Sequence, residues 1–223
     1  MNLRYKCLIL DHDDTAVDST AMIHYPAHLE IMKRLRPGTT PVSLKEWFKK
    51  NYHPGVMEYY TEELNFSSEE IQTEYDIWRE FTQTKTPDFY HGFIDLLEEY
   101  RKRGGIITVV SHSDTDIIRK HYKHHSNGSD LQPEIIFGWT EDQEKRKPSP
   151  YPVNCILAEL NLSREDALIV DDLKPGVKMA HASGVRVAGA GWGHQIPEIK
   201  SDMEDTCDMY FSTVDEFRDH ILG

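Results

Sequence analysis

The sequence lacks any hydrophobic run long enough to cross a bilayer. A membrane-spanning helix needs about 20 consecutive, mostly apolar residues, and no stretch of this chain approaches that pattern. Basic residues are also in short supply, with Lys+Arg 25 against Asp+Glu 38 and a formal net charge of -13. A surface of this sign repels nucleic acid backbones and anionic membranes. We therefore expect neither a nucleic acid nor a membrane as a partner.

Cysteine is scarce as well. Cys7, Cys155 and Cys207 are scattered and odd in number, so they indicate neither a disulfide framework nor paired metal-ligating thiols. Residues 1–10 form a short strand-like segment that runs into acidic residues, a pattern unlike that of a signal peptide. These features predict a protein of the reducing cytoplasm.

Short apolar runs rich in β-branched residues are what the chain does have. Such runs are typical of strands buried on both faces, as in a parallel sheet. Helical patterns lie between them, and one of these, over 93–100, ends at Gly104-Gly105, a good helix stop. The alternation predicts an α/β core with a doubly wound, Rossmann-like parallel sheet. The six expected strands are 7–10, 106–110, 134–137, 167–170, 185–188 and 209–211.

Residues 19–87 differ from the rest of the chain. They lack strand-like runs, show helical patterns, and are interrupted at Pro37-Gly38 and Pro54-Gly55. Residues 67–70, Ser-Ser-Glu-Glu, have the serine cap and acidic first turn of a helix start. We therefore expect two domains: an α/β core from residues 1–18 and 88–223, and an inserted α-helical cap domain from residues 19–87.

Polar side chains suited to phosphate and metal chemistry follow three of the expected strands. They are Asp11, Ser111 and the pair Asp171-Asp172, and Lys147 lies in the connection between the second and third of these sites. In an open parallel sheet, ligands bind beyond the carboxyl ends of the strands. The sequence thus predicts one site at that edge.

The segment Asp11-His12-Asp13 places two carboxylates two residues apart. Along an extended backbone they point to the same side, so one can attack phosphorus while the other handles the proton of the leaving group. A helix-loop-helix calcium site is excluded, because its sixth and twelfth positions need Gly and Glu and here hold Ala16 and Met22. From this segment alone, a plain solvated turn remains an alternative interpretation.

Residues 8–19, LILDHDDTAVDS, resemble the first motif of the haloacid-dehalogenase-like hydrolases. Ser111 at a strand end resembles the second motif, Lys147-Pro148 the third, and the acidic segment 169–177 the fourth, all in the family's order. Residues 87–92 and 191–194 resemble the branch of phosphoglycolate phosphatase and β-phosphoglucomutase, whose members carry a helical cap after the first motif.

The resemblance implies a role for each matching residue. Asp11 would be the nucleophile that is transiently phosphorylated, and Asp13 the acid and then the base. Ser111 and Lys147 would bind the transferring phosphoryl group. The cofactor would be Mg²⁺, a cation that prefers oxygen ligands. Its ligands would be the carboxylates of Asp11, Asp171 and Asp172 and the backbone carbonyl of Asp13.

Departures from the family's pattern leave alternatives open. His112 stands where the family commonly has Asn; it is a candidate substrate-binding residue, or tolerated loop variation. Asp14 replaces a usual Gly, which motivates a non-catalytic binding module as one rival. A phosphomutase is the other rival, although Ile23 occupies the position of that branch's cap histidine, with His24 one step away.

The expected function is a magnesium-dependent phosphatase that hydrolyses a small phosphate monoester through an aspartyl-phosphate. The expected partner is a small phosphorylated metabolite, chosen by residues of the cap. Residues 121–125, His-Tyr-Lys-His-His, could be mistaken for a transition-metal site. Because they lead into Ser126-Asn127-Gly128, we interpret them as a solvated helix end and turn.

Overall fold

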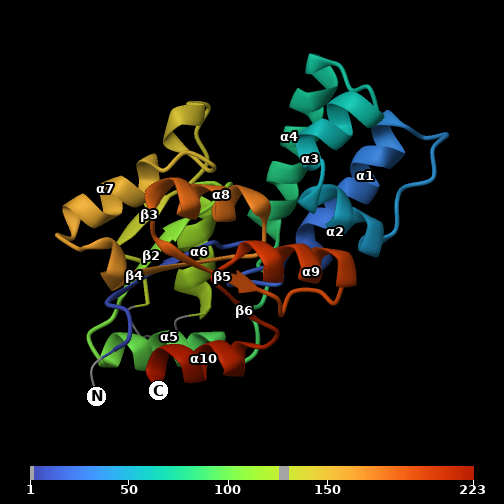
Figure 1. Cartoon of the computed structure of the whole chain (residues 1–223). Helices are drawn as coiled ribbons and strands as arrows, with labels where there is room; N and C mark the ends of the chain where they lie inside the picture. Colours follow the sequence, from blue (N-terminus) through green and yellow to red (C-terminus); the bar gives the residue numbers. More distant parts are fainter. Residues whose placement is uncertain (1–2, 126–130) are drawn as a thin grey trace. The chain divides into compact units, whose positions relative to one another are not determined.

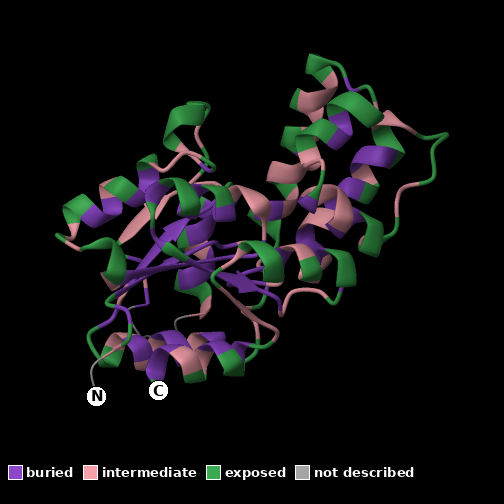
Figure 2. Cartoon of the chain, in the orientation of Figure 1, coloured by how far each residue is buried: buried purple, intermediate pink, exposed green. Residues whose placement is uncertain are grey.

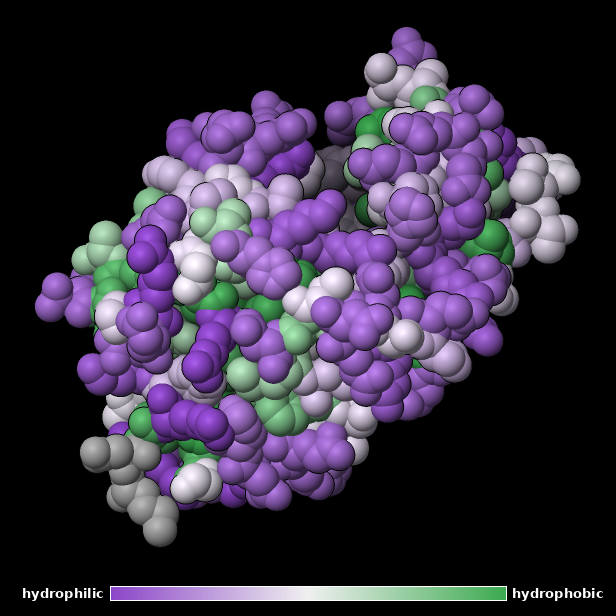
Figure 3. All heavy atoms as spheres, viewed as in Figure 1, coloured by the Kyte–Doolittle hydropathy of each residue, from purple (hydrophilic) through white to green (hydrophobic). Residues whose placement is uncertain are grey.

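The structure, a computed structural model, describes residues 3–125 and 131–223. Its contacts divide the chain into two compact units. The core unit consists of Met1–Asp18 and Asp88–Gly223, and the cap unit of Ser19–Pro87. No helix in the described ranges has the length and apolar character needed to cross a membrane. Hydrophilic residues cover most of the face that Figure 3 shows.

The core unit is built on a six-stranded, fully parallel sheet (Figure 1). The strand order is β3-β2-β1-β4-β5-β6, so the first strand of the chain lies in the middle of the sheet. In register, Leu10 of β1 lies between Val109 of β2 and Val170 of β4. The strands are β1 Cys7–Leu10, β2 Ile106–Val110, β3 Ile135–Phe137, β4 Ala167–Asp171, β5 Arg186–Ala190 and β6 Met209–Phe211.

Helices cover both faces of this sheet. On one face, Leu8 and Leu10 belong to a buried cluster with side chains of α5, α6 and α10, and Figure 1 shows α5 and α10 side by side there. On the other face, α7 contacts β2, and α8 contacts β4 and β5. The helices are α5 Phe93–Lys102, α6 Thr115–His125, α7 Tyr151–Glu159, α8 Lys174–Ser183, α9 Pro197–Thr206 and α10 Val214–Leu222, with 3₁₀ turns η3 Gln143–Lys145 and η4 Arg164–Asp166.

The predicted α/β class with a parallel sheet is confirmed, and a strand lies at each of the six expected places. The four inner strands, β2, β1, β4 and β5, are buried over nearly their whole length (Figure 2), as expected of apolar runs in a parallel sheet. The edge strands β3 and β6 are only partly buried. The helix expected over 93–100 runs on to Lys102 and is followed by Gly104, which has a φ of +89°. Glycine adopts this conformation without a steric penalty.

The backbone segments that flank the cap unit are bonded to each other within the core unit. Val17 and Phe89 form an isolated antiparallel bridge. Asp18 N donates to Asp88 O at 2.9 Å, and Tyr90 N donates to Ala16 O at 3.1 Å. The chain therefore leaves and re-enters the core unit at adjacent points.

Helices are the only regular elements of the cap unit, all of whose residues are described. Its apolar core consists of Ile31, Trp47, Tyr59, Tyr60, Phe66 and Ile77. The start of α4 is the one expected, because Ser67 Oγ accepts from Glu70 N at 3.2 Å and Glu70 Oε2 accepts from Ser67 N at 2.9 Å. The elements are η1 Thr20–His24, α1 Tyr25–Leu35, α2 Leu44–Tyr52, α3 Val56–Glu58, η2 Tyr59–Glu63 and α4 Ser68–Thr84.

Candidate active site

The carboxyl ends of β1, β2 and β4 bring the polar residues of the predicted site together. Asp11 follows β1, and its amide donates to Val170 O at 2.8 Å. Ser111 follows β2, and its amide donates to Phe137 O at 2.9 Å. These bonds extend the sheet by one residue on each strand. One carboxylate oxygen from each of Asp11, Asp171 and Asp172 lies within 4.8 Å of the others, and all three residues are buried.

Lys147 joins two of these carboxylates. Its Nζ lies 2.6 Å from Asp11 Oδ1 and 2.7 Å from Asp171 Oδ2, and the lysine is itself buried. Burial alone would lower the pKa of the Lys147 ammonium, but the charges of Asp11 and Asp171 outweigh this effect and raise the pKa. The lysine therefore remains a fixed positive charge beside Asp11 at neutral pH.

The two aspartates at the end of β4 have different partners. Asp171 Oδ2 accepts from Lys147 and Asp171 Oδ1 accepts from Leu173 N at 2.9 Å, so this carboxylate orients the lysine. Asp172 Oδ1 accepts from Thr15 Oγ1 at 3.1 Å. Desolvation by burial, followed by repulsion from Asp11 and other nearby carboxylates, raises the pKa of Asp172 well above its usual range.

This cluster fits a divalent cation. When the three carboxylates of Asp11, Asp171 and Asp172 are ionised, the single ammonium of Lys147 leaves two negative charges uncompensated among these buried groups. Buried charges are costly unless they are paired or bind a metal. The donor atoms are carboxylate oxygens, the ligands that Mg²⁺ prefers. Residues and cation thus match in both charge and chemistry.

A tight turn follows Asp11. Asp14 has a φ of +55°, and its amide donates to Val17 O at 2.8 Å. Aspartate enters this left-handed region more readily than most residues, which explains how Asp14 can replace the family's usual Gly. Trp192 Nε1 donates to Thr15 O at 2.8 Å, so the segment 191–194, noted for its family resemblance, anchors this turn.

The structure adds Ser113, which the sequence reasoning missed. Its Oγ donates a hydrogen bond to Asp13 Oδ2, and its amide donates to Ser111 Oγ at 3.1 Å. Ser113 is buried, whereas Asp13 keeps partial access to solvent. A second serine two residues after Ser111 was the available signal, but nothing in the sequence paired it with Asp13.

His112 contacts the backbone of the lysine loop. Its Nε2 lies 3.1 Å from Lys147 O, and its ring meets the Trp139 indole edge-on, with centroids 6.1 Å apart. Desolvation of the ring and the nearby charge of Lys147 lower the pKa of His112 to about 4, although much of the residue is accessible to solvent. A neutral His112 can donate from Nε2 to the Lys147 carbonyl.

The interpretation of residues 121–125 as solvated was wrong for His121 and Tyr122, which are both buried. His121 Nδ1 lies 2.9 Å from Nε2 of His12. The reason is that α6 turns the side chains of Ile117, Ile118, His121 and Tyr122 inward. Helix α6 is described as far as His125, and the expected turn at Ser126-Asn127-Gly128 lies outside the described residues.

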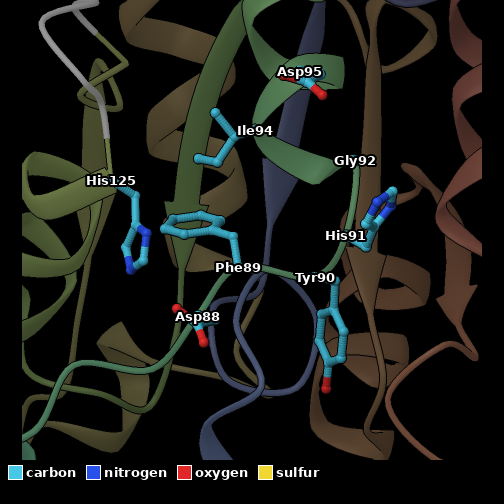
Figure 4. A pocket seen from close by; sticks show the side chains of 8 residues that line it. All are labelled: Asp88, Phe89, Tyr90, His91, Gly92, Ile94, Asp95 and His125. Atoms are coloured by element: carbon cyan, nitrogen blue, oxygen red, sulfur yellow. The ribbon is translucent and has the colours of Figure 1, made fainter.

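A separate hollow of the core unit lies beside the start of α5 (Figure 4). Its volume is about 370 Å³. Phe89 and His125 meet edge-on there, with ring centroids 5.3 Å apart. The lining residues are Asp88, Phe89, Tyr90, His91, Gly92, Ile94, Asp95 and His125, so none of the carboxylates of the cluster around Lys147 takes part in it.

Comparisons with known proteins agree with the fold. No curated protein matches the sequence. A haloacid dehalogenase-like family hydrolase from Streptococcus pneumoniae has 19% identity and a TM-score of 0.75, with 96% of this chain and 97% of that chain covered. A predicted phosphatase from Clostridium acetobutylicum has 20% identity and a TM-score of 0.77, with 98% of each chain covered. At these identities the likeness concerns the fold alone.

The sequence itself identifies the family. The sequence model of the haloacid dehalogenase-like hydrolase family matches residues 8–190 of this chain. This range contains Asp11 and Asp13 after β1, Ser111 after β2, Lys147, and the two aspartates at the end of β4. The chain belongs to the haloacid dehalogenase-like hydrolase family.

Proposed function

We propose that this protein is a magnesium-dependent phosphatase that hydrolyses a small phosphate monoester through an aspartyl-phosphate on Asp11. The observation that carries the proposal is the position of Lys147 Nζ, within hydrogen-bond distance of both Asp11 and Asp171. A buried carboxylate with a fixed ammonium beside it is suited to attack an anionic phosphoryl group, because the ammonium offsets the repulsion. The Clostridium acetobutylicum neighbour, named a predicted phosphatase, supports the same activity.

In the first half-reaction, a carboxylate oxygen of Asp11 forms a bond to phosphorus and the bond from phosphorus to the alcohol oxygen breaks. Asp13 gives its proton to the departing oxygen. Ser111 and Lys147 donate hydrogen bonds to the phosphoryl oxygens, where charge has to be stabilised during transfer. His112, which follows Ser111 and contacts the backbone carbonyl of Lys147, is proposed to contact the substrate.

In the second half-reaction, Asp13 takes a proton from water. The water oxygen forms a bond to phosphorus, the bond between phosphorus and Asp11 breaks, and inorganic phosphate leaves. Asp13 is then protonated again for the next substrate, so the cycle closes with no other reactant consumed.

The residues proposed to hold Mg²⁺ are Asp11, Asp172 and the backbone carbonyl of Asp13, with Asp171 close by. When bound, the cation would offset negative charge on the phosphoryl oxygens. Residues 19–87 are proposed to act as the cap domain that selects a small phosphorylated metabolite. Within this unit, His24 Nδ1 accepts from Trp78 Nε1 at 3.0 Å, and Ile23 is buried. The family position of a mutase histidine thus holds a packed isoleucine, which favours hydrolysis over mutase chemistry.

The test is magnesium-dependent release of phosphate from 4-nitrophenyl phosphate and from a panel of phosphorylated metabolites. Asp11→Asn should remove turnover while the circular dichroism spectrum stays unchanged. Asp219→Asn, at an exposed position of α10, is the matched control and should keep full activity. Mass spectrometry of the acid-quenched wild type should find phosphate on the peptide that contains Asp11. Normal turnover by Asp11→Asn would overturn the proposal.

A further inference from the structure

We propose that Ser113 is a positioning residue that holds the carboxyl group of Asp13 for proton transfer and links it to the phosphoryl-binding Ser111. This inference rests on the proposed function. It assigns a role to a residue that none of the four family motifs includes.

The contacts of Ser113 connect the two parts of the site. Its Oγ donates to Asp13 Oδ2, and its amide donates to Ser111 Oγ at 3.1 Å. One residue thus holds both the proposed acid and the hydroxyl that would contact the phosphoryl group. Because Ser113 is only 2% exposed, water competes little for these bonds.

The loop that carries Ser113 is itself held in place by the end of β3. Trp139 N donates to Ser113 O at 2.9 Å. Gly138 packs so closely on the loop that an added Cβ would lie 2.8 Å from Ser113 O and 2.7 Å from Thr115 N. The position of the Ser113 hydroxyl is therefore set by the backbone of two segments.

The hydrogen bond suits both halves of the reaction. A hydroxyl donor to Oδ2 can persist whether Asp13 carries a proton or not, because Oδ2 accepts in either state. The bond restrains the rotation of the carboxyl group that is proposed to exchange a proton with the alcohol and later with water. In turn, Ser111 Oγ accepts from the Ser113 amide, which leaves the Ser111 hydrogen for a phosphoryl oxygen.

A purely structural role in starting α6 does not account for this serine. In the first turn of α6, the amides of Ile117 and Ile118 both donate to Asp114 O at 3.1 Å. The Ser113 hydroxyl is directed to Asp13 instead, across 100 residues of sequence. Its removal should therefore affect proton transfer more than helix stability.

The experiment compares kcat/KM for two esters, 4-nitrophenyl phosphate and an alkyl phosphate. This constant reports the steps up to departure of the alcohol. The nitrophenolate leaves without needing a proton, whereas an alkoxide needs one, and positioned proton transfer contributes about 10²–10⁴-fold. Ser113→Ala should lose roughly 10²-fold on the alkyl ester and less than about 10-fold on the aryl ester. Ser113→Thr, which keeps the hydroxyl, should restore most of the loss.

Ser183→Ala is the matched control, because Ser183 is similarly buried and its hydroxyl donates to Ala180 O at 2.9 Å, within α8. It should affect both esters equally. An equal loss on both esters in Ser113→Ala, with no rescue by Ser113→Thr, would show a purely structural role and overturn the inference. Unchanged kcat/KM for both esters in Ser113→Ala would also overturn it. If the wild type releases phosphate from no ester, the proposed function fails and the Ser113 assignment fails with it.

Discussion

A Cβ atom placed on Gly176 would lie 1.9 Å from Asp171 Oδ2. The first turn of α8 therefore packs directly on the carboxylate that binds Lys147. Asp171 cannot move aside easily, because Lys147 Nζ and Leu173 N hold its two oxygens. A glycine at this place is what lets the helix and the carboxylate approach each other.

Gly176→Ala should consequently damage both the fold and the site. Overpacking of a well-packed region costs about 1–3 kcal/mol, and displacement of Asp171 would release Lys147 from its position beside Asp11. We expect a lower midpoint in urea unfolding together with a lower kcat/KM. Gly38→Ala is the control, since a Cβ there meets nothing within 4 Å. Unchanged kcat/KM in Gly176→Ala would contradict this account of Asp171.

Replacing the buried lysine should be more severe. Lys147→Met removes the positive charge between Asp11 and Asp171, and breaking a buried ion pair typically costs about 3–5 kcal/mol. Turnover should fall by at least about 10²-fold, the effect of losing one fixed donor to the transition state. Lys147→Arg should not restore it, because a planar guanidinium does not replace a compact ammonium.

Lys145→Met serves as the matched control two residues away. Its Nζ pairs with Asp142 Oδ2 at 3.0 Å, and its side chain is 54% exposed. Exposed ion pairs contribute at most about 1 kcal/mol, so this variant should keep both its unfolding midpoint and its turnover. Equal behaviour of the two methionine variants would count against the role given to Lys147.

Magnesium should bind the free protein and stabilise it. A ligand present at 100 times its Kd adds about 2.7 kcal/mol to the free energy of unfolding. We expect the thermal midpoint to rise with Mg²⁺ and isothermal titration calorimetry to give one site. Asp172→Asn should abolish both effects, and Asp205→Asn, an exposed control on α9, should retain them. Binding that survives in Asp172→Asn would place the cation elsewhere.

The stability of the cap unit should depend on pH through His28. Its ring stacks on Trp47 with centroids 4.1 Å apart, and its Nδ1 lies 3.1 Å from Tyr60 Oη. Burial lowers the pKa of His28 from 6.5 to about 4. Between these values the unfolded chain binds a proton that the folded chain does not. The contribution of His28 is therefore complete above pH 6.5 and is lost as the pH falls toward 4.

The expected loss is about 3 kcal/mol, from roughly 1.4 kcal/mol for each unit of the difference in pKa. Urea unfolding at a series of pH values measures it. His28→Phe should flatten the curve between pH 6.5 and 4, whereas His91→Phe, at an exposed position, should leave it as in the wild type. A wild-type free energy of unfolding that stays level over this range would refute the assignment.

Local patterns in the sequence predicted the strands and the residues that follow them, because strands buried on both faces leave continuous apolar runs. Helices α9 and α10 were not predicted, and only residues 121–125 of α6 were expected to be helical. In α6 the buried face contains His121 beside Ile117 and Ile118, so its polarity hides the helical pattern. The bond between Ser113 and Asp13 spans 100 residues and depends on loop paths that no local pattern reports. The same holds for the packing of Gly176 on Asp171.

The hydrogen bonds between residues 16–18 and 88–90 bear on whether the inserted residues 19–87 can be replaced. Because Asp18 N and Asp88 O are already bonded, the core closes on itself at the root of the insertion, whatever length of chain is inserted there. Residues 19–87 could be exchanged for another segment without reopening the sheet. A chain with a short glycine-rich bridge in their place should keep the circular dichroism signature of the parallel sheet; its loss would show that the core depends on the insert.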